Sequence, residues 1–401
     1  MSDLRTSWNG LLGYSAATLL QARDADNFPS SGSGGARCII TTNLVGPKAA
    51  AGQPGSAGPG SNSGSSANPG SSTQTGKPSA PSSVPAANLP PSPWNLVKTH
   101  AGDSFFDEWD FWTDADPTHG NVQFVDENTA RSTGLISVNA NGTVMMKVDT
   151  TPVITSPNRQ SVRITTNYQY TGGILVLDAV HAPTGCATWP AFWSNGPNWP
   201  NNGEIDIMEG VNDLTVNQAS IHTAPGCMIS NSEAANGATG TLVGGSNCAS
   251  AESNNGGCGQ QATSLSNTYG PPFNSNGGGV YAMVWDDTGI SVFFFPRNNI
   301  PVDITGLKPQ PQNWGVPFAR WPTTNCTTSQ FFNVHSAIFD TTLCGDWAGN
   351  VWNTAQSPGQ EQSCAQRTGF QTCAQFVQNS GASFDQAYWE VNSVRLYQMS
   401  N

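Results

Sequence analysis

Three carboxylates, those of Glu204, Asp206 and Glu209, lie within the segment EIDIME. In an extended strand, residues two positions apart share a face, so Glu204 and Asp206 are expected to point the same way. The interleaved Ile205 and Ile207 would then point into a hydrophobic core. The segment therefore predicts one strand with an acidic face and an apolar face.

Glu209 lies five positions after Glu204, so a regular strand would send it to the apolar face. One extra residue in the strand, a β-bulge near Ile207–Met208, would return Glu209 to the acidic face. Retaining hydrolysis of a glycosidic bond requires two carboxyl groups about 5–5.5 Å apart, one as nucleophile and one as proton donor. Because carboxylates so close cannot all ionise together, one pKa is expected to rise and keep a general acid protonated near neutral pH.

The alternative for these residues is a solvated acidic strand face without a catalytic role, since charged runs usually face water. Three tryptophans flank the segment, at Trp189, Trp193 and Trp199. Indole rings can stack on the apolar C–H faces of sugars, and they also pack in cores. The surrounding sequence therefore favours a carbohydrate site over a plain acidic surface.

Short β-prone runs, separated by Gly, Asn, Asp and Pro clusters, surround this segment, and no long stretch has a helical period. The runs are Val144–Val148, Ser161–Thr166, Gly173–Leu177, Ala282–Trp285, Ile290–Phe295 and Glu390–Tyr397. Many short strands with irregular loops in one unit of roughly 300 residues predict an all-β fold, an antiparallel β-sandwich or jelly roll. One or two short helices are expected within Cys364–Phe376.

The composition changes along the chain and divides it into three parts. Residues 1–45 carry no recognisable motif, and residues 46–93 are almost entirely Gly, Ser, Pro, Ala, Asn and Thr. Such a composition predicts a disordered linker, whose Ser and Thr residues are candidates for O-glycosylation and which could tether the protein to a surface. From residue 94 aromatic residues become frequent, so we assign residues 94–401 to a single domain that carries the acidic motif.

Charge and hydrophobicity make several classes of partner unfavourable. The net charge is −12 and no cluster of Lys or Arg occurs, so nucleic acid and anionic membranes are poor partners. No run of 18 apolar residues is present, which predicts the absence of a transmembrane helix. Residues 11–20 are mildly apolar but do not make a clear secretory signal.

The cysteines indicate an oxidising compartment. Of nine cysteines, eight fall within residues 186–373 and Cys38 stands apart. An even set in one domain predicts disulfides and secretion, and the absence of a CxxC pair disfavours zinc. Sequence alone does not give the connectivity; Cys364–Cys373 and Cys248–Cys258 are our guesses, because they are close along the chain.

The residues around the acidic motif resemble a known family. WPAFW at 189–193, followed by GPNWPNNGEIDIMEGVN at 196–212, resembles the active-site signature of glycoside hydrolase family 16, particularly its fungal laminarinase-like members. Supporting stretches lie at 111–122, 221–227 and 342–349. The resemblance covers about residues 94–401.

This resemblance implies a β-jelly roll whose concave face binds glucan. It implies that Glu204 attacks the anomeric carbon as the nucleophile. Glu209 would first protonate the leaving oxygen and then activate water, while Asp206 tunes the pair. The implied substrate-binding residues, each with a structural role as the alternative, are Trp193, Trp199, His222 and Trp285.

His222 matches a family position near the acidic row, and it could hydrogen-bond a sugar or Glu209. His119 and His335 are as compatible with structural as with functional roles, whereas Asp346 and Trp347 are expected to support a loop. Residues 231–274 are rich in Gly, Ser and Asn and have no strand pattern, so we expect a disulfide-pinned loop over the cleft there.

These features favour a secreted, monomeric endo-β-1,3(4)-glucanase, located outside the cell or in its wall, with no cofactor and no metal. A cell-wall glucan transglycosylase stays open, because it would use the same covalent intermediate. A non-catalytic β-glucan-binding protein also stays open, although such proteins of this fold tend to lose one acidic residue. Another neutral polymer, such as a galactan, is a third alternative.

Overall fold

The computed structural model describes residues 89–399. The N-terminal segment 1–45, including Cys38, and residues 46–88 of the predicted linker lie outside the described residues. Residues 90–92, at the end of the predicted linker, contact the domain: Ser92 Oγ donates to the carbonyl of Pro309, and Gln310 Nε2 donates to the carbonyls of Pro90 and Pro91.

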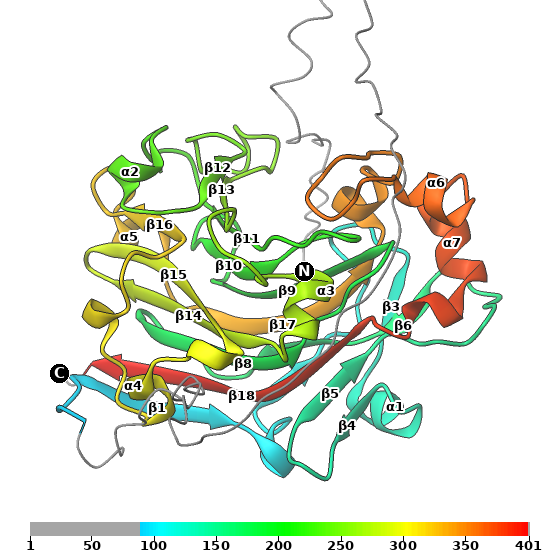
Figure 1. Cartoon of the computed structure of the whole chain (residues 1–401), viewed down its shortest axis with the longest axis horizontal. Helices are drawn as coiled ribbons and strands as arrows, with labels where there is room; N and C mark the ends of the chain where they lie inside the picture. Colours follow the sequence, from blue (N-terminus) through cyan, green and yellow to red (C-terminus); the bar gives the residue numbers. More distant parts are fainter. Residues whose placement is uncertain (1–88, 400–401) are drawn as a thin grey trace, which may run out of the picture. The chain divides into compact units, whose positions relative to one another are not determined.

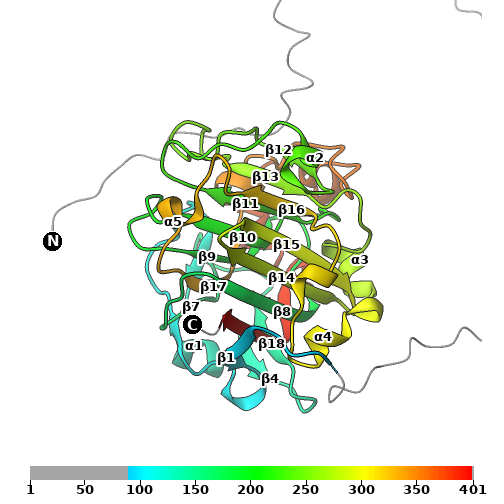
Figure 2. The ribbon, with the colours of Figure 1, turned by 90° about the vertical axis from the view of Figure 1, so that its left-hand side faces the viewer.

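Two antiparallel sheets, each of eight strands, pack face to face in the described part of the chain (Figures 1 and 2). The first, here called the β14 sheet, has the order β16 (Ala319–Pro322), β15 (Gly289–Pro296), β14 (Gly279–Asp286), β8 (Gly173–His181), β18 (Tyr388–Met399), β5 (Val144–Lys147) and β4 (Ile136–Val138), with β1 (Trp94–His100) also paired to β18. The predicted all-β antiparallel sandwich is confirmed.

The second sheet, here called the β10 sheet, contains the acidic segment near its centre. Its order is β12 (Thr241–Val243), β13 (Cys258–Gln261), β11 (Gln218–His222), β10 (Glu204–Glu209), β9 (Thr188–Asn195), β17 (Ser336–Leu343), β7 (Arg163–Thr166) and β2 (Trp109–Phe111). A separate parallel pair is formed by β3 (Val122–Phe124) and β6 (Arg159–Ser161).

Short helices occupy the connections between the strands. They are α1 (Glu127–Ser132), α2 (Glu233–Asn236), α3 (Gly270–Ser275), α4 (Val302–Thr305), α5 (Thr328–Phe331), α6 (Cys364–Thr368) and α7 (Cys373–Asn379), with 3₁₀ turns η2 (Gly102–Ser104), η3 (Arg297–Asn299), η4 (Pro311–Asn313) and η6 (Gly381–Phe384), and a π-helical turn η5 (Gly345–Gly349). The sequence predicts one or two short helices within Cys364–Phe376; α6 lies there, and α7 begins there and ends at Asn379. In the described part of the chain, no helix has the length and apolar character needed to cross a bilayer.

The main core lies between the two sheets and follows the alternation of each strand. On β14, Tyr281 and Met283 point into this core, while Val280 and Ala282 point to the other face of the sheet. That other face is also covered, by the segment that carries α4 and η4. The outer face of the β10 sheet carries polar and aromatic side chains instead, because only one face of an antiparallel sheet has to be buried in the core.

All six predicted β-prone runs form strands. The run Ser161–Thr166 contributes to two strands. Val162 lies between β6, which pairs with β3, and β7, which pairs with β17. The prediction that residues 231–274 lack strands is wrong, since β12 and β13 extend the β10 sheet beyond β11. The two strands have three and four residues, and β13 (CGQQ) has no hydrophobic alternation, so β13 is held by its pairing with β11 and in turn pairs with β12.

Four disulfides fasten the loops of the domain. Cys248–Cys258 is paired as predicted, but the predicted Cys364–Cys373 bond is wrong. Each of those two cysteines begins its own helix and pairs with a distant partner, giving Cys186–Cys364 and Cys344–Cys373, and the fourth bond is Cys227–Cys326.

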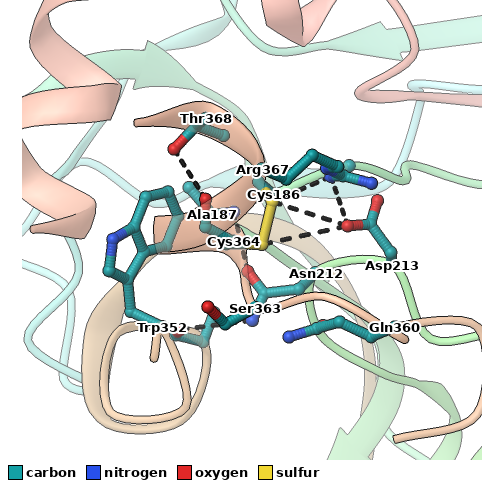
Figure 3. Close-up of a disulfide and its surroundings, with 12 residues drawn as sticks. Cys186, Ala187, Asn212, Asp213, Trp352, Gln360, Ser363, Cys364, Arg367 and Thr368 are labelled. Atoms are coloured by element: carbon teal, nitrogen blue, oxygen red, sulfur yellow. Dashed lines mark hydrogen bonds and ion pairs between the residues drawn. A yellow bond between two sulfur atoms is a disulfide. The ribbon is translucent and has the colours of Figure 1, made fainter. Parts of the chain in front are cut away.

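The Cys186–Cys364 bond lies in a second, smaller core under α6 and α7 (Figure 3). Beside it, Arg367 of α6 forms an ion pair with Asp213, four residues after the end of the acidic strand β10. The bond closes a loop of 178 residues, so it ties the C-terminal helices to the sheet that carries the acidic segment.

Candidate active site

Strand β10 contains one residue more than its neighbours allow. On β11, Asp206 lies opposite Ser220 and Glu209 lies opposite Gln218, so two residues of β10 face one of β11. The pairing with β9 shifts at the same place. The predicted bulge near Ile207–Met208 is therefore confirmed.

The bulge separates the side chains of β10 into two groups. Ile205, Ile207 and Met208 are completely buried in the core between the sheets. Glu204, Asp206 and Glu209 lie on the outer face, where Glu204 is partly exposed and the other two are 3% and 9% exposed. The acidic face and the apolar face predicted for this segment are both present.

Two side chains of the neighbouring strands contact these carboxyls. Trp189 Nε1 on β9 donates a hydrogen bond of 2.7 Å to Glu209 Oε1. His222 on β11 places its Nε2 3.3 Å from Asp206 Oδ2 and 4.0 Å from Glu204 Oε1. The hydrogen bond to Glu209 that we considered for His222 thus comes from Trp189, and His222 lies beside the other two carboxyls.

Burial and mutual repulsion favour the protonated forms of these carboxyls. Loss of solvation is the larger cause, and it raises the pKa of Glu204 to about 8, with the neighbouring Asp206 adding to the rise. The pKa of Asp206 is raised to about 8 by burial and by Asp340. Burial and Asp206 raise the pKa of Glu209 well above its ordinary value, against the opposing hydrogen bond from Trp189. The row therefore retains protons near neutral pH.

The raised pKa values give the fold a pH dependence that can be measured. A carboxyl with a higher pKa in the folded state stabilises the fold below its unfolded pKa, and this contribution is lost as the pH rises through the folded value. We expect the free energy of unfolding to fall by about 1–3 kcal/mol between about pH 6.5 and 8.5. Buried histidines have lowered pKa values, about 4 for His335, and their contribution has the opposite sign and fades once the pH passes the unfolded value of about 6.5, so they add little above pH 7.

Urea unfolding at several pH values measures this slope. Asp206→Asn should flatten it, because one of the mutually repelling carboxyls is removed. The matched control is Asp126→Asn, since Asp126 is an exposed helix cap whose pKa is lowered by the hydroxyl of Thr129. An unchanged slope in Asp206→Asn would contradict the electrostatic description of the row.

A second charged group lies on the same face of the β10 sheet. The guanidinium carbon of Arg163 on β7 is 4.8 Å from the ring centre of Trp112 and 5.1 Å from that of Trp193. Arg163 also lies 3.8 Å from Asp340 of β17, whose pKa is raised to about 7 by burial. Trp193 is partly exposed on the site face, and its role in stacking on substrate stays a prediction, whereas Arg163 and Asp340 gave no recognisable signal in the sequence.

The connection from β9 to β10 carries Trp199, which is partly exposed and hydrogen-bonds Glu204. Buried His335 holds this connection: its Nε2 donates to the carbonyl of Asn202 at 2.8 Å, and its Nδ1 accepts from Ser194 Oγ at 3.0 Å. Both ring nitrogens are occupied within the protein, so the role of His335 is structural.

The prediction that Trp285 stacks on substrate is wrong. It lies on β14, in the other sheet, and is only 3% exposed. Its ring packs between the sheets, 4.9 Å from that of His335 and 6.1 Å from those of Tyr170 and Phe332. An indole enclosed in this way cannot offer a face to a sugar.

The segment that contains η5 contacts the site through Trp189. The ring of Trp347 packs edge-on against that of Trp189, with centroids 5.7 Å apart. His119 Nδ1 lies 2.8 Å from Asp346 Oδ2, which joins the loop before β3 to the same segment. This arrangement agrees with the expected loop-supporting role of Asp346. It also places Trp347 against Trp189, the residue that hydrogen-bonds Glu209.

The 231–274 segment reaches the site at His222. Gly257 has a φ of +56°, and a Cβ there would lie 2.9 Å from His222 Nδ1 and 2.4 Å from the carbonyl of Ile221. Only glycine fits so close an approach. The next residue forms the Cys248–Cys258 bond, so a disulfide fixes this segment against the imidazole.

Two groups in the described part of the chain bring three possible metal ligands within 4.8 Å of one another. One consists of two carboxyls of the row, Glu204 and Asp206, together with His222; in the other, Asp213 adjoins Cys186 and Cys364, whose sulfurs are bonded to each other. In the first group the three side chains are close because His222 lies beside both carboxyls. In the second group the two cysteines form a disulfide, so neither has a thiolate that could bind a metal. That no metal or cofactor takes part stays a prediction.

Comparisons with known proteins agree with this fold and site. The family described as "XgeA-like, catalytic GH16 domain" matches residues 109–397. A probable endo-1,3(4)-β-glucanase of Aspergillus niger is 41% identical over 77% of this chain and 40% of that protein. A probable glycosidase of Schizosaccharomyces pombe is 42% identical over 76% of this chain and 69% of that protein.

Solved structures give the same result. The GH16 laminarinase 16A of Phanerochaete chrysosporium, solved with two β-glucans in its donor and acceptor sites, is 38% identical with a TM-score of 0.68, covering 76% of this chain and 99% of that chain. An elongating GH16 β-1,3-glucosyltransferase is 35% identical with the same TM-score, covering 76% and all of that chain.

The sandwich and its acidic row define a glycoside hydrolase domain of the β-jelly-roll type. The chain belongs to glycoside hydrolase family 16, and its matched segment spans less than half of the Aspergillus relative.

Proposed function

We propose that this domain is a retaining endo-β-1,3(4)-glucanase in which Glu204 is the nucleophile and Glu209 the general acid/base. The observation that carries the proposal is the bulge in β10, which sets Glu209 on the same face as Glu204 and Asp206. Without that extra residue, a strand would hold the two glutamates on opposite faces.

In the first step Glu204 attacks the anomeric carbon and forms a C–O bond to it, and it does so in its ionised form, which its pKa of about 8 makes the minor form at neutral pH. The bond between that carbon and the glycosidic oxygen breaks, and Glu209 gives its proton to the departing oxygen. Burial supports the acid role, because it raises the pKa of Glu209 and keeps the carboxyl protonated before the reaction. Trp189 fixes the direction of that carboxyl through its hydrogen bond to Oε1.

In the second step Glu209, now ionised, removes a proton from water, whose oxygen attacks the anomeric carbon and releases Glu204. Asp206 lies between the two glutamates along the strand, with His222 at its side. Asp206 interacts electrostatically with both glutamates, so the three carboxyls titrate as a coupled group. The negative charge leaves Glu204 and appears on Glu209 during the first step, and Asp206 responds to both changes.

The substrate and the location follow from the relatives and the disulfides. The Aspergillus relative is named a probable endo-1,3(4)-β-glucanase, and the Phanerochaete laminarinase was solved with β-glucans. Trp193 and Trp199 are partly exposed near the row, where an indole can stack on a glucosyl ring. Four disulfides favour secretion to the cell exterior or wall, where they persist.

A glucan transglycosylase is the second candidate. The observation that favours it is the similarity to an elongating β-1,3-glucosyltransferase of the same family, 35% identical over three quarters of this chain. Both activities share the first step, and they differ only in whether water or a sugar hydroxyl attacks the glycosyl–Glu204 intermediate.

Digestion of laminarin, mixed-linkage β-glucan and carboxymethyl cellulose tests the proposal, with product sizes followed over time. We expect short oligosaccharides from the first two polymers and none from cellulose. A parallel reaction contains an acceptor such as laminaribiose, and products longer than the donor chain there would favour the transglycosylase. Failure of the folded protein to cleave any of the three polymers would overturn the glucanase proposal.

A further inference from the structure

The bulge in β10 leaves two backbone groups that the strand ladder cannot pair in the ordinary way, the carbonyl of Ile207 and the N–H of Glu209. Both are bonded by one side chain. Asn217 Oδ1 accepts from Glu209 N at 2.9 Å, and Asn217 Nδ2 donates to Ile207 O at 3.0 Å. The carboxamide of Asn217 therefore replaces the missing rung of the ladder.

Asn217 is itself held in place on every side. It is completely buried, immediately before β11. Its backbone N–H donates to Thr268 Oγ1 at 3.0 Å, and its carbonyl accepts from Ala262 N at 2.9 Å. The hydroxyl of buried Tyr281 in turn donates to the carbonyl of Thr268. These bonds fix the carboxamide relative to the core of the sandwich.

Only a planar group with an acceptor and a donor side by side can satisfy both backbone groups at once. A buried amide N–H or carbonyl without a hydrogen-bond partner is destabilising, so without Asn217 the bulge would shift or open toward water. Either change would move the Cα of Glu209, because the N–H that Asn217 binds belongs to Glu209 itself.

We infer that Asn217 is a positioning residue for the reaction, which locks the β10 bulge and so aims Glu209 at the leaving oxygen. This inference rests on the proposed role of Glu209. It adds a residue that touches neither substrate nor the reacting atoms and acts only through the backbone of β10. A displacement of about 1 Å in a reacting group can lower a rate by 10²-fold, so the effect should be measurable.

The test compares Asn217→Ala with Asn236→Ala. Asn236 is a matched control, because it is 2% exposed and its carboxamide makes the same pair of backbone bonds, from Ser230 N at 3.0 Å and to Ser230 O at 2.9 Å. Both variants lose similar bonds, but only Asn217 is connected to Glu209. For each, kcat/KM is measured on laminarin and on a dinitrophenyl β-laminaribioside, whose leaving group needs no proton.

We expect Asn217→Ala to lose roughly 10–100-fold on laminarin and less than about 3-fold on the dinitrophenyl substrate, because only the first reaction needs Glu209 as an acid. Asn236→Ala should keep the wild-type ratio between the two substrates. If Asn217→Ala does not fold, Asn217→Asp gives the same test: a protonated carboxyl can replace both bonds, whereas an ionised one cannot donate. Its laminarin deficit should therefore grow as the pH rises.

Two outcomes separate this inference from the proposed function. If Glu209→Gln shows no dependence on the leaving group, the acid role of Glu209 fails and the inference fails with it. If Glu209→Gln shows that dependence but Asn217→Ala slows both substrates equally, the acid role stands and Asn217 is only structural. The double variant that combines Asn217→Ala with Glu209→Gln should be no more than about 2-fold slower on laminarin than Glu209→Gln alone. The acidic carboxyl that Asn217 positions is already absent from Glu209→Gln.

Discussion

Glu204→Ala should reduce the hydrolysis of laminarin by roughly 10⁴–10⁶-fold, the range observed when an enzyme loses its nucleophile. The methyl group cannot form the glycosyl intermediate, and Glu209 cannot compensate because its carboxyl is held by Trp189 in a position suited to proton donation. The rate is measured from reducing ends released over hours. Glu127→Ala is the matched control, since Glu127 is a partly exposed residue of α1 that forms an ion pair with Arg131.

Azide distinguishes a lost nucleophile from a damaged fold. In Glu204→Ala the anion can enter the space left by the carboxylate and attack the anomeric carbon, while Glu209 still protonates the leaving oxygen. The C–N bond forms on the face opposite the leaving group, so the product is the α-glycosyl azide from a β-glucan. Near-normal turnover of the alanine variant without azide would exclude Glu204 as the nucleophile.

Glu209→Gln should have an effect that depends on the substrate. On laminarin we expect a loss of roughly 10²–10⁴-fold, the usual contribution of a general acid. On a dinitrophenyl glycoside the first step needs no proton, so the loss should be much smaller, and the glycosyl–Glu204 intermediate should accumulate as a burst of dinitrophenol. Glutamine preserves the hydrogen bond from Trp189, so the change removes the proton with little disturbance of the site.

With a variant of Glu209, azide should give a product of the opposite anomeric configuration to that from Glu204→Ala. With Glu209→Ala and the dinitrophenyl substrate, azide should attack the glycosyl–Glu204 intermediate, and two inversions give the β-glycosyl azide. The anomeric configuration of the azide product thus assigns the two glutamates independently of any rate. An equal collapse on every substrate, with no burst, would count against the acid/base role of Glu209.

The local chemistry of β10 could be predicted from the sequence because it depends on neighbours within a few residues. The alternation of carboxylates with Ile205 and Ile207, and the five-residue spacing of the glutamates, are enough to require a bulge if both are to act. The all-β fold follows for the same reason, since short β-prone runs between turn residues have few other ways to bury their apolar side chains.

Contacts between distant segments could not be predicted in this way. Trp285 looked like a platform for a sugar, but its position two residues from Met283 on β14 puts it in the core. Cys364 and Cys373 are near in sequence, yet each begins a different helix and meets a partner elsewhere in the fold. Asn217 was invisible for the same reason, because its importance comes from a turn that returns its side chain to Ile207 and Glu209.

The sequence by itself determined the acidic strand, its need for a bulge, the sandwich architecture and the family resemblance, because these depend on side-chain periodicity and on motifs within one segment. Only the tertiary structure decided which groups surround the carboxyls: Trp189 on Glu209, His222 on Asp206, and Asn217 on the bulge. The physical reason is that solvation, hydrogen bonding and charge repulsion act over a few ångströms in space. The pKa values and the orientation of the three carboxyls are therefore set by the side chains of the neighbouring strands, which are distant in sequence.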